Sequence, residues 1–263
     1  AKGMSISNFS SHRAFFQFER EVGRTSRFVR SESADEFLEA VRQTCSERRI
    51  EIKKGAGLWR AQVGHGMRFD EGIEEELPCA LPPARMVPLK DRAAEGRANP
   101  KGIPVLYLAT EKFAAMTEVR PWLGSYISLG HFEVLRDLPL VDCGRDHDLK
   151  GRSYLGGKPS ESQWNDYVWS DISRAFSRPV TRSDDGNEYV ATQILTELFR
   201  SEEFQGVAYR SAFGKRAYNV ALFDLEAARL RSCELHEAKK AEFQFSEIDN
   251  PYFVTPKSAR KRN

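Results

Sequence analysis

Apolar residues recur with helical spacing in three stretches of the chain. Residues 34–49 carry apolar side chains three and four positions apart, with charged residues between them, and Ser33 is placed to cap this helix. Residues 161–177 and 186–200 repeat the pattern with aromatic and aliphatic side chains. We interpret all three stripes as helix faces that pack on a core.

Short apolar runs bounded by turn residues predict strands before and after the last two helices. Residues 125–135 and 138–142 suit two strands that a hairpin about Arg136 and Asp137 would join. The other predicted strands are LWRAQ (58–62), IPVLYLAT (103–110), FQGVAYRSAF (204–213) and YNVALFD (218–224).

A short helix is predicted over residues 111–120, where Thr110 is placed to cap its start and a proline follows its end. Glu118 lies on this helix one turn after Ala114 and Ala115. Because those two side chains are small, they leave room beside the carboxylate.

Two segments have less regular patterns. Residues 64–88 contain three glycines and four prolines, a composition typical of a long loop. Residues 8–30 form an arginine-rich arm with several aromatic residues. The sequence leaves open whether this arm packs on the domain or binds a partner.

The predicted elements favour an α+β fold. Strands occur before and after the helices without strict βαβ alternation, which favours a mainly antiparallel or mixed sheet with flanking helices over a Rossmann fold. We divide the chain into an N-terminal extension with one amphipathic helix (1–50), a main domain (51–230) and a C-terminal extension with a basic tail (231–263).

Composition and charge narrow the functional classes. The 263 residues are 40% hydrophobic and 11% aromatic, as in a folded globular protein. Forty Lys and Arg residues against 38 Asp and Glu give a formal charge of +2, so the overall balance does not indicate nucleic-acid binding or an anionic membrane surface. No run of about 18 apolar residues and no secretory signal are found, which predicts a cytoplasmic protein. The four cysteines and five histidines lack metal-ligand spacing, so we expect no metal site.

Four short motifs occur in a fixed order between about residues 55 and 225. They are LWRA (58–61), GRANPKGIPVLYLA (96–109), TEV (117–119), and GVAYRSAF (206–213) followed by YNVALFD (218–224). In this order the set resembles the RES-domain family, which is named for an arginine, a glutamate and a serine. The matching residues here are Arg60, Glu118 and Ser211, and the longest motif adds Arg97 and Tyr107.

The resemblance implies a fold like the ADP-ribosyltransferases and an enzyme that degrades NAD, its substrate rather than its cofactor. Hydrolysis and phosphorolysis of the nicotinamide–ribose bond are both consistent with it. Many members of this family are bacterial toxins that a protein antitoxin restrains, and some resemble phage-defence effectors. We therefore expect an antitoxin or regulatory partner, and a homo-oligomer stays open.

The chemistry of this bond suits the matched residues. Nicotinamide leaves as a neutral ring from a cationic pyridinium, so no general acid is required. Glu118 can hold a ribose hydroxyl and face the developing oxocarbenium charge. A guanidinium matches the paired pyrophosphate oxygens, and Arg60 is the first candidate and Arg97 the second.

The other matched side chains have supporting roles in this prediction. Tyr107 is expected to stack on the nicotinamide or ribose edge, and Ser211 to hydrogen-bond the ribose or Glu118. Trp59 and Asn219 complete the predicted substrate contacts. Ser211 is not cast as a nucleophile, because no histidine adjoins it in the matched motifs.

Each residue alone also has an ordinary explanation. Arg60 would serve as a surface ion-pair partner, Tyr107 as a core aromatic, Glu118 as a solvent-facing helix residue and Arg97 as part of a turn. The ordered combination favours the NAD site. An ADP-ribosyltransferase that modifies a protein or nucleic acid, and a partner-binding module without turnover, are the alternative functions.

Overall fold

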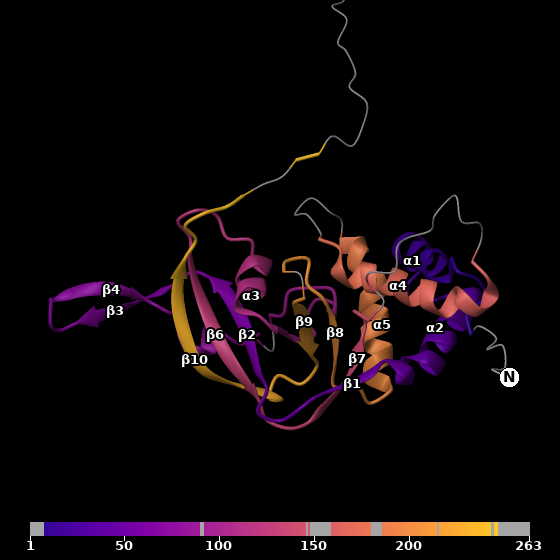
Figure 1. The fold of residues 1–263 in the computed structure, drawn as a ribbon, viewed down its shortest axis with the longest axis horizontal. Helices are drawn as coiled ribbons and strands as arrows, with labels where there is room; N and C mark the ends of the chain where they lie inside the picture. The colour runs from indigo at the N-terminus through magenta and orange to yellow at the C-terminus, as the bar shows by residue number, and fades with distance from the viewer. Residues whose placement is uncertain are drawn as a thin grey trace, which may run out of the picture.

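The computed structural model describes residues 8–89, 92–145, 147, 159–179, 186–214, 216–242 and 245–246. It shows a large mixed sheet with most of the helices gathered at one end and a two-stranded hairpin projecting from the other (Figure 1). The predicted α+β class with a mainly antiparallel sheet and flanking helices is confirmed. The predicted basic tail lies outside the described residues. Among the residues described, none of the helices has the length and apolar character needed to cross a membrane.

The large sheet has eight strands in the order β1-β7-β8-β9-β5-β2-β6-β10. Only β7 and β8 run parallel, and the other neighbouring pairs are antiparallel. The strands in this order are β1 Arg49–Ile52, β7 Leu138–Asp142, β8 Gly206–Arg210, β9 Tyr218–Leu222, β5 Leu106–Ala109, β2 Gly57–Val63, β6 Tyr126–Val134 and β10 Ala228–Glu237.

The predicted hairpin about Arg136 and Asp137 is wrong. Strand β6 pairs with β2 and β10, whereas β7 pairs with β1 and β8 in the other half of the sheet. The physical reason is a shared core: Phe132 of β6 and Leu140 of β7 are fully buried in one apolar cluster. Residues 135–137 therefore connect two strands that share a core but pair with different neighbours.

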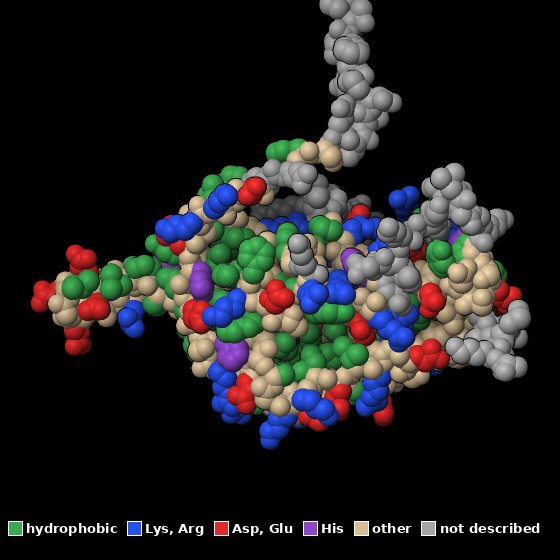
Figure 2. Space-filling model, in the orientation of Figure 1, with side chains coloured by type: hydrophobic (Ala, Val, Ile, Leu, Met, Phe, Trp, Pro, Cys, Tyr) green, Lys and Arg blue, Asp and Glu red, His purple; other side chains and the backbone are tan. Residues whose placement is uncertain are grey.

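The predicted loop over residues 64–88 contains a hairpin of its own, which corrects the loop assignment. Strands β3 Gly66–Asp70 and β4 Glu75–Cys79 pair with each other and project from the sheet (Figure 1). Acidic side chains surround its tip (Figure 2). Pro78 fits in β4 because a two-stranded ribbon has an outer edge where a missing N–H leaves no bond unmade.

Four helices form a layer at the other end of the sheet, and their bounds are α1 Ala14–Arg24, α2 Glu32–Cys45, α4 Trp164–Ser177 and α5 Val190–Ser201. The two predicted helices at 161–177 and 186–200 are confirmed, each with a short 3-10 turn at its start. The four 3-10 turns are η1 Ser46–Arg48, η2 Pro83–Arg85, η3 Glu161–Gln163 and η4 Gly186–Tyr189.

The arginine-rich arm packs on the domain. Phe18 of α1 stacks on Phe37 of α2, with ring centroids 4.5 Å apart, and Phe15 and Val22 are buried with them. The cap of α2 is Ser31, whose hydroxyl accepts the amide of Ala34, so the prediction of Ser33 is two residues too late. Helix α1 of the arm thus contributes to the hydrophobic core, and only part of the surface of the arm is exposed.

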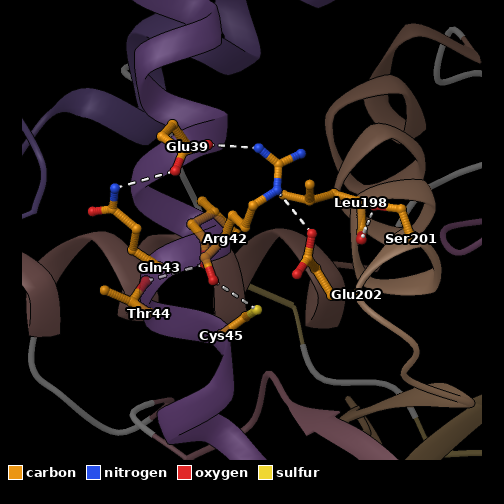
Figure 3. A network of polar contacts seen from close by, with 9 residues as sticks. Glu39, Arg42, Gln43, Thr44, Cys45, Leu198, Ser201 and Glu202 are labelled. Atoms are coloured by element: carbon orange, nitrogen blue, oxygen red, sulfur yellow. Dashed lines mark hydrogen bonds and ion pairs between the residues drawn. The ribbon is translucent and has the colours of Figure 1, made fainter.

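Arg42 provides a polar link between α2 and the residue that follows α5 (Figure 3). It donates to Glu39 at 2.6 Å and to Glu202 at 2.8 Å. Because these side chains are about half exposed, water screens the ion pairs and they contribute little to stability. The buried aromatic contacts therefore hold the helical layer together more than this network does.

Strand β10 was absent from the sequence prediction. It pairs with β6 along nearly its whole length, with a register shift between Leu230 and Ser232. The predicted division of the chain at residues 230 and 231 falls inside this strand, and the division itself stays a prediction.

Candidate active site

A cavity opens where the large sheet divides between β2 and β5. These two strands pair only at Trp59 and Ala109, whereas β2 follows β6 for seven residues and β5 follows β9 for four. Beyond that single pair the strands separate. Residues 60–63 of β2, and Tyr107 and Leu108 of β5, line a cavity of about 440 Å³ between the two strands. This volume lies in the range of about 300–1,000 Å³ typical of small-molecule sites.

The floor of the cavity is one row of residues across four strands. Trp59 lies opposite Ala109, Ala109 opposite Asn219, and Asn219 opposite Tyr209. Residues directly opposite each other point to the same face of a sheet. All four line the cavity, so residues from distant parts of the chain meet there because of strand register.

Helix α3, Lys112–Glu118, closes one side of the cavity. Its buried residues are Ala114 and Ala115, which pack on Ala61 and Ala109 of the sheet. Small side chains on both surfaces let the helix approach the strands closely. Thr110 does not cap this helix: its hydroxyl accepts the amide of Tyr218 instead, and so ties the start of α3 to β9.

Glu118, the last residue of α3, is held by two side chains from other elements. Its Oε1 accepts a hydrogen bond from the Ser211 hydroxyl at 2.9 Å and from the Asn219 amide at 2.6 Å. Ser211 also accepts the amide of Phe213, so its hydroxyl hydrogen points to the glutamate. Ser211 and Asn219 are buried although Glu118 itself is exposed. A fixed carboxylate thus stands at the cavity wall, with neither bond using Oε2.

Arg60 spans the gap between the separated strands. Its Nη1 donates to the Tyr107 carbonyl at 3.0 Å, and its buried Nε has no hydrogen-bond partner among the described residues. Burial lowers the pKa of this guanidinium from its ordinary value. A buried cationic donor without a partner costs free energy, and an anion in the cavity would supply that partner.

Tyr107 lines the cavity, but its hydroxyl serves the preceding turn. The hydroxyl donates to Asn99 Oδ1 at 2.6 Å and accepts the amide of Ala98 at 2.9 Å. Burial raises the pKa of Tyr107 well above its ordinary value. The hydroxyl is therefore neutral and already makes two hydrogen bonds. Only the ring of Tyr107 is available to a ligand in the cavity.

Arg97 is not brought to the cavity. Its guanidinium donates to the carbonyls of Ala175 and Arg178 at the C-terminal end of α4, and it lies 5.6 Å from the centre of the Tyr189 ring. The last carbonyls of a helix lack intrahelical partners and favour a cation. Arg97 caps α4, and its predicted contact with phosphate stays a prediction that this placement does not support.

Trp59 reaches the cavity, although its ring already has polar neighbours. The Lys112 ammonium lies 4.5 Å from the ring centre, and His131 lies 4.5 Å away on the neighbouring strand. Sequence reasoning missed Tyr209 as part of the site. Its position two residues before Ser211 places it on the same face of β8, a signal that the strand period supplied.

Comparison with known proteins adds one family. Residues 80–246, more than half of the chain, match the RES domain. Tyr107, Glu118, Ser211 and Asn219 fall within this match, and Arg60 precedes it. No curated protein matches the chain. A chain in the crystal structure of the M. tuberculosis MbcT-MbcA toxin-antitoxin complex is 18% identical, with a TM-score of 0.41 over 75% of this chain and 92% of that chain.

Proposed function

From the premise that the chain belongs to the RES-domain family, we propose that it degrades NAD by cleaving the bond between nicotinamide and ribose. The observation that carries the proposal is the Glu118 carboxylate, which Ser211 and Asn219 hold at the wall of a cavity that also contains Arg60. A fixed anion and a partly buried cation facing one cavity suit a substrate with a cationic nicotinamide ring next to the ribose and an anionic pyrophosphate.

The reaction requires stabilisation of positive charge on the ribose. As the glycosidic bond breaks, its electron pair stays with the pyridine nitrogen, and nicotinamide leaves as a neutral molecule. The ribose becomes oxocarbenium-like, and a carboxylate fixed before the reaction stabilises that charge without reorganising. Water then adds to the anomeric carbon and releases a proton, which gives ADP-ribose.

The neighbouring groups position Glu118 and the substrate. Ser211 and Asn219 fix one carboxylate oxygen, so they act as positioning residues. Arg60 is the group we assign to the pyrophosphate, because its Nε has no partner in the described part of the chain and a guanidinium can bind two phosphate oxygens at once. The Tyr107 ring offers an aromatic surface for the nicotinamide ribose.

A toxin role follows from the proposed reaction. An enzyme that hydrolyses a central cofactor harms its own cell unless another molecule blocks its cavity. We therefore include in the proposal a protein antitoxin that restrains the enzyme, as the family resemblance implies.

Product analysis tests the reaction. The purified chain is incubated with NAD in buffers with and without inorganic phosphate, and the products are separated by chromatography. Nicotinamide and ADP-ribose indicate hydrolysis, and ADP-ribose 1-phosphate indicates phosphorolysis. Stable labelling of protein or nucleic acid by labelled NAD in a cell extract would replace the hydrolase with a transferase. Unchanged NAD over a long incubation would overturn the proposal.

A further inference from the structure

A second cavity adjoins the one that holds Glu118. It has a volume of about 530 Å³ and shares three wall residues with the first, namely Arg60, Gln62 and Tyr107. The two cavities therefore meet at the separated ends of β2 and β5, with Arg60 between them. A ligand longer than one cavity can pass from the first to the second along Arg60.

The outer wall of the second cavity is cationic. Among the described residues, Arg85 at the end of η2 and Arg92 further along the same segment line it with Arg60, together with one acidic side chain, Glu95. The segment is anchored by Met86, which is fully buried in the core on that side of the sheet. The buried neighbour holds Arg85 at the cavity, and three guanidiniums against one carboxylate favour an anionic ligand.

The same wall has an apolar part. Val87, Leu89 and Val105 line it, and Leu89 has 52% of its surface exposed. A flat aromatic base would cover such a surface and remove it from water. Cationic and apolar groups side by side thus match a phosphorylated nucleoside better than a simple anion.

We propose that the second cavity binds the adenylate half of the dinucleotide, with Arg85 and Arg92 contacting the adenylate phosphate and the apolar wall covering the adenine. This assignment rests on the proposed function, which places the nicotinamide end at Glu118. The pyrophosphate then lies at Arg60, the cationic residue among the three that line both cavities. Arg85 and Arg92 would then distinguish NAD from shorter substrates, and bond cleavage takes place in the first cavity.

Two substrates of different length test the assignment. NAD and nicotinamide mononucleotide contain the same scissile bond, but the shorter one lacks the adenylate half. For the double variant Arg85→Ala/Arg92→Ala, the KM for NAD is expected to rise about 10-fold with kcat nearly unchanged, because charge-assisted bonds to phosphate act in substrate binding. Cleavage of nicotinamide mononucleotide should be unchanged. Equal effects on both substrates, or no effect on NAD, would overturn the proposal.

A binding measurement keeps this test separate from the reaction. ADP serves as the probe, and its affinity for the wild-type chain, the double variant and Arg68→Ala is measured by calorimetry. Arg68→Ala removes one positive charge from β3, at a residue that lines neither cavity, so ADP affinity should fall about 10-fold only in the double variant. If ADP binds in this way but NAD is not cleaved, the reaction fails and the subsite stands. If NAD is cleaved but ADP affinity is equal in all three, the subsite fails alone.

Discussion

The end of α3 and the turn at residues 96–99 are both rich in polar side chains, yet they use them in opposite ways. At the end of α3, Ser211 and Asn219 converge on Glu118, whose carboxylate stays exposed at a cavity. In the turn, Asn99 is buried and bonded on every side, with its amide donating to three backbone carbonyls and its oxygen accepting from Tyr107. The end of α3 presents a carboxylate to the cavity, whereas the polar groups of the turn hydrogen-bond to one another and to nearby backbone.

The difference separates residues for a ligand from residues for the fold. Polar groups that satisfy each other stabilise a chain conformation, and polar groups that remain available at a cavity have a use only when something binds. The turn is further secured by Gln193 of α5, which donates to the carbonyls of Gly96 and Asn99. Substitutions in the two regions should therefore separate loss of activity from loss of stability.

The largest effect is expected for Glu118→Gln. The variant keeps an oxygen for Ser211 and Asn219 but removes the negative charge, so NAD cleavage should fall about 10³-fold because one preorganised electrostatic contact is lost. The melting temperature should stay within about 2 °C of wild type, since the substituted side chain is exposed. NAD consumption and thermal melting measure the two quantities. Glu71→Gln, on the projecting hairpin, is the matched control. Full activity in Glu118→Gln would remove this residue from the site.

Asn99→Ala should cause the next largest change, in stability. It leaves three backbone carbonyls and the Tyr107 hydroxyl without their partner, which costs about 3 kcal/mol of unfolding free energy. Denaturant unfolding measures this loss.

A second substitution shows which bonds of Asn99 matter. Asn99→Asp keeps the acceptor for Tyr107 but turns a second acceptor toward the three carbonyls, so it should destabilise the chain at least as much as Asn99→Ala. Asn165→Ala, at a half-buried asparagine of α4 whose side chain bonds Asn8, should lower the unfolding free energy by no more than about 1 kcal/mol. Equal stability of the Asn99 variants and wild type would show that the turn is not held by this side chain.

The two arginines provide a paired comparison with somewhat smaller effects. Arg60→Ala should lower kcat/KM for NAD about 100-fold, through lost contact with the pyrophosphate, and lower the unfolding free energy by about 1 kcal/mol for one hydrogen bond. Arg97→Ala should lower the unfolding free energy by about 2 kcal/mol, because α4 loses its cap, with kcat/KM changed by less than about 3-fold. Steady-state kinetics gives kcat/KM for both variants, and denaturant unfolding gives their free energies of unfolding. A large loss of activity in Arg97→Ala would show that Arg97 contributes to substrate binding after all.

This pair also shows where sequence reasoning ends. Arg60 and Arg97 occur in similar settings, each in a motif beside the same predicted pocket, so residue type alone assigns both to phosphate. The distinction comes from α4, about 80 residues later in the chain, whose terminal carbonyls occupy Arg97. Local patterns do not contain that information, because it depends on packing between distant elements.

The same limit applies to the sheet. The helices at 161–177 and 186–200 were predictable because an apolar stripe is a local signal. The partners of β6 and β7 were not, since strand pairing is non-local and a short connection suggested a hairpin. Strand β10 was missed because polar and charged residues fill much of it, and only its pairing with β6 identifies it as sheet.

The smallest effects on NAD cleavage are expected where Gly96 meets Tyr107. A Cβ added at Gly96 would lie 2.6 Å from the Tyr107 hydroxyl oxygen, so Gly96→Ala forces the turn and the ring apart. Such overpacking costs about 1–3 kcal/mol. Tyr107→Phe removes the hydroxyl and its two bonds, at about 1 kcal/mol.

The double variant Gly96→Ala/Tyr107→Phe should be more stable than the sum of the single changes predicts, by about 1 kcal/mol, because the atom that the new methyl group would strike is gone. Denaturant unfolding of the four proteins measures this coupling, and additive losses would contradict the contact. Tyr107→Phe should also keep NAD cleavage within about 3-fold of wild type, since its ring still faces the cavity. A loss of two orders of magnitude would instead show that the hydroxyl takes part in the reaction. Tyr107 would then belong with Glu118 among the residues that act on the substrate, and not with the residues that only hold the turn.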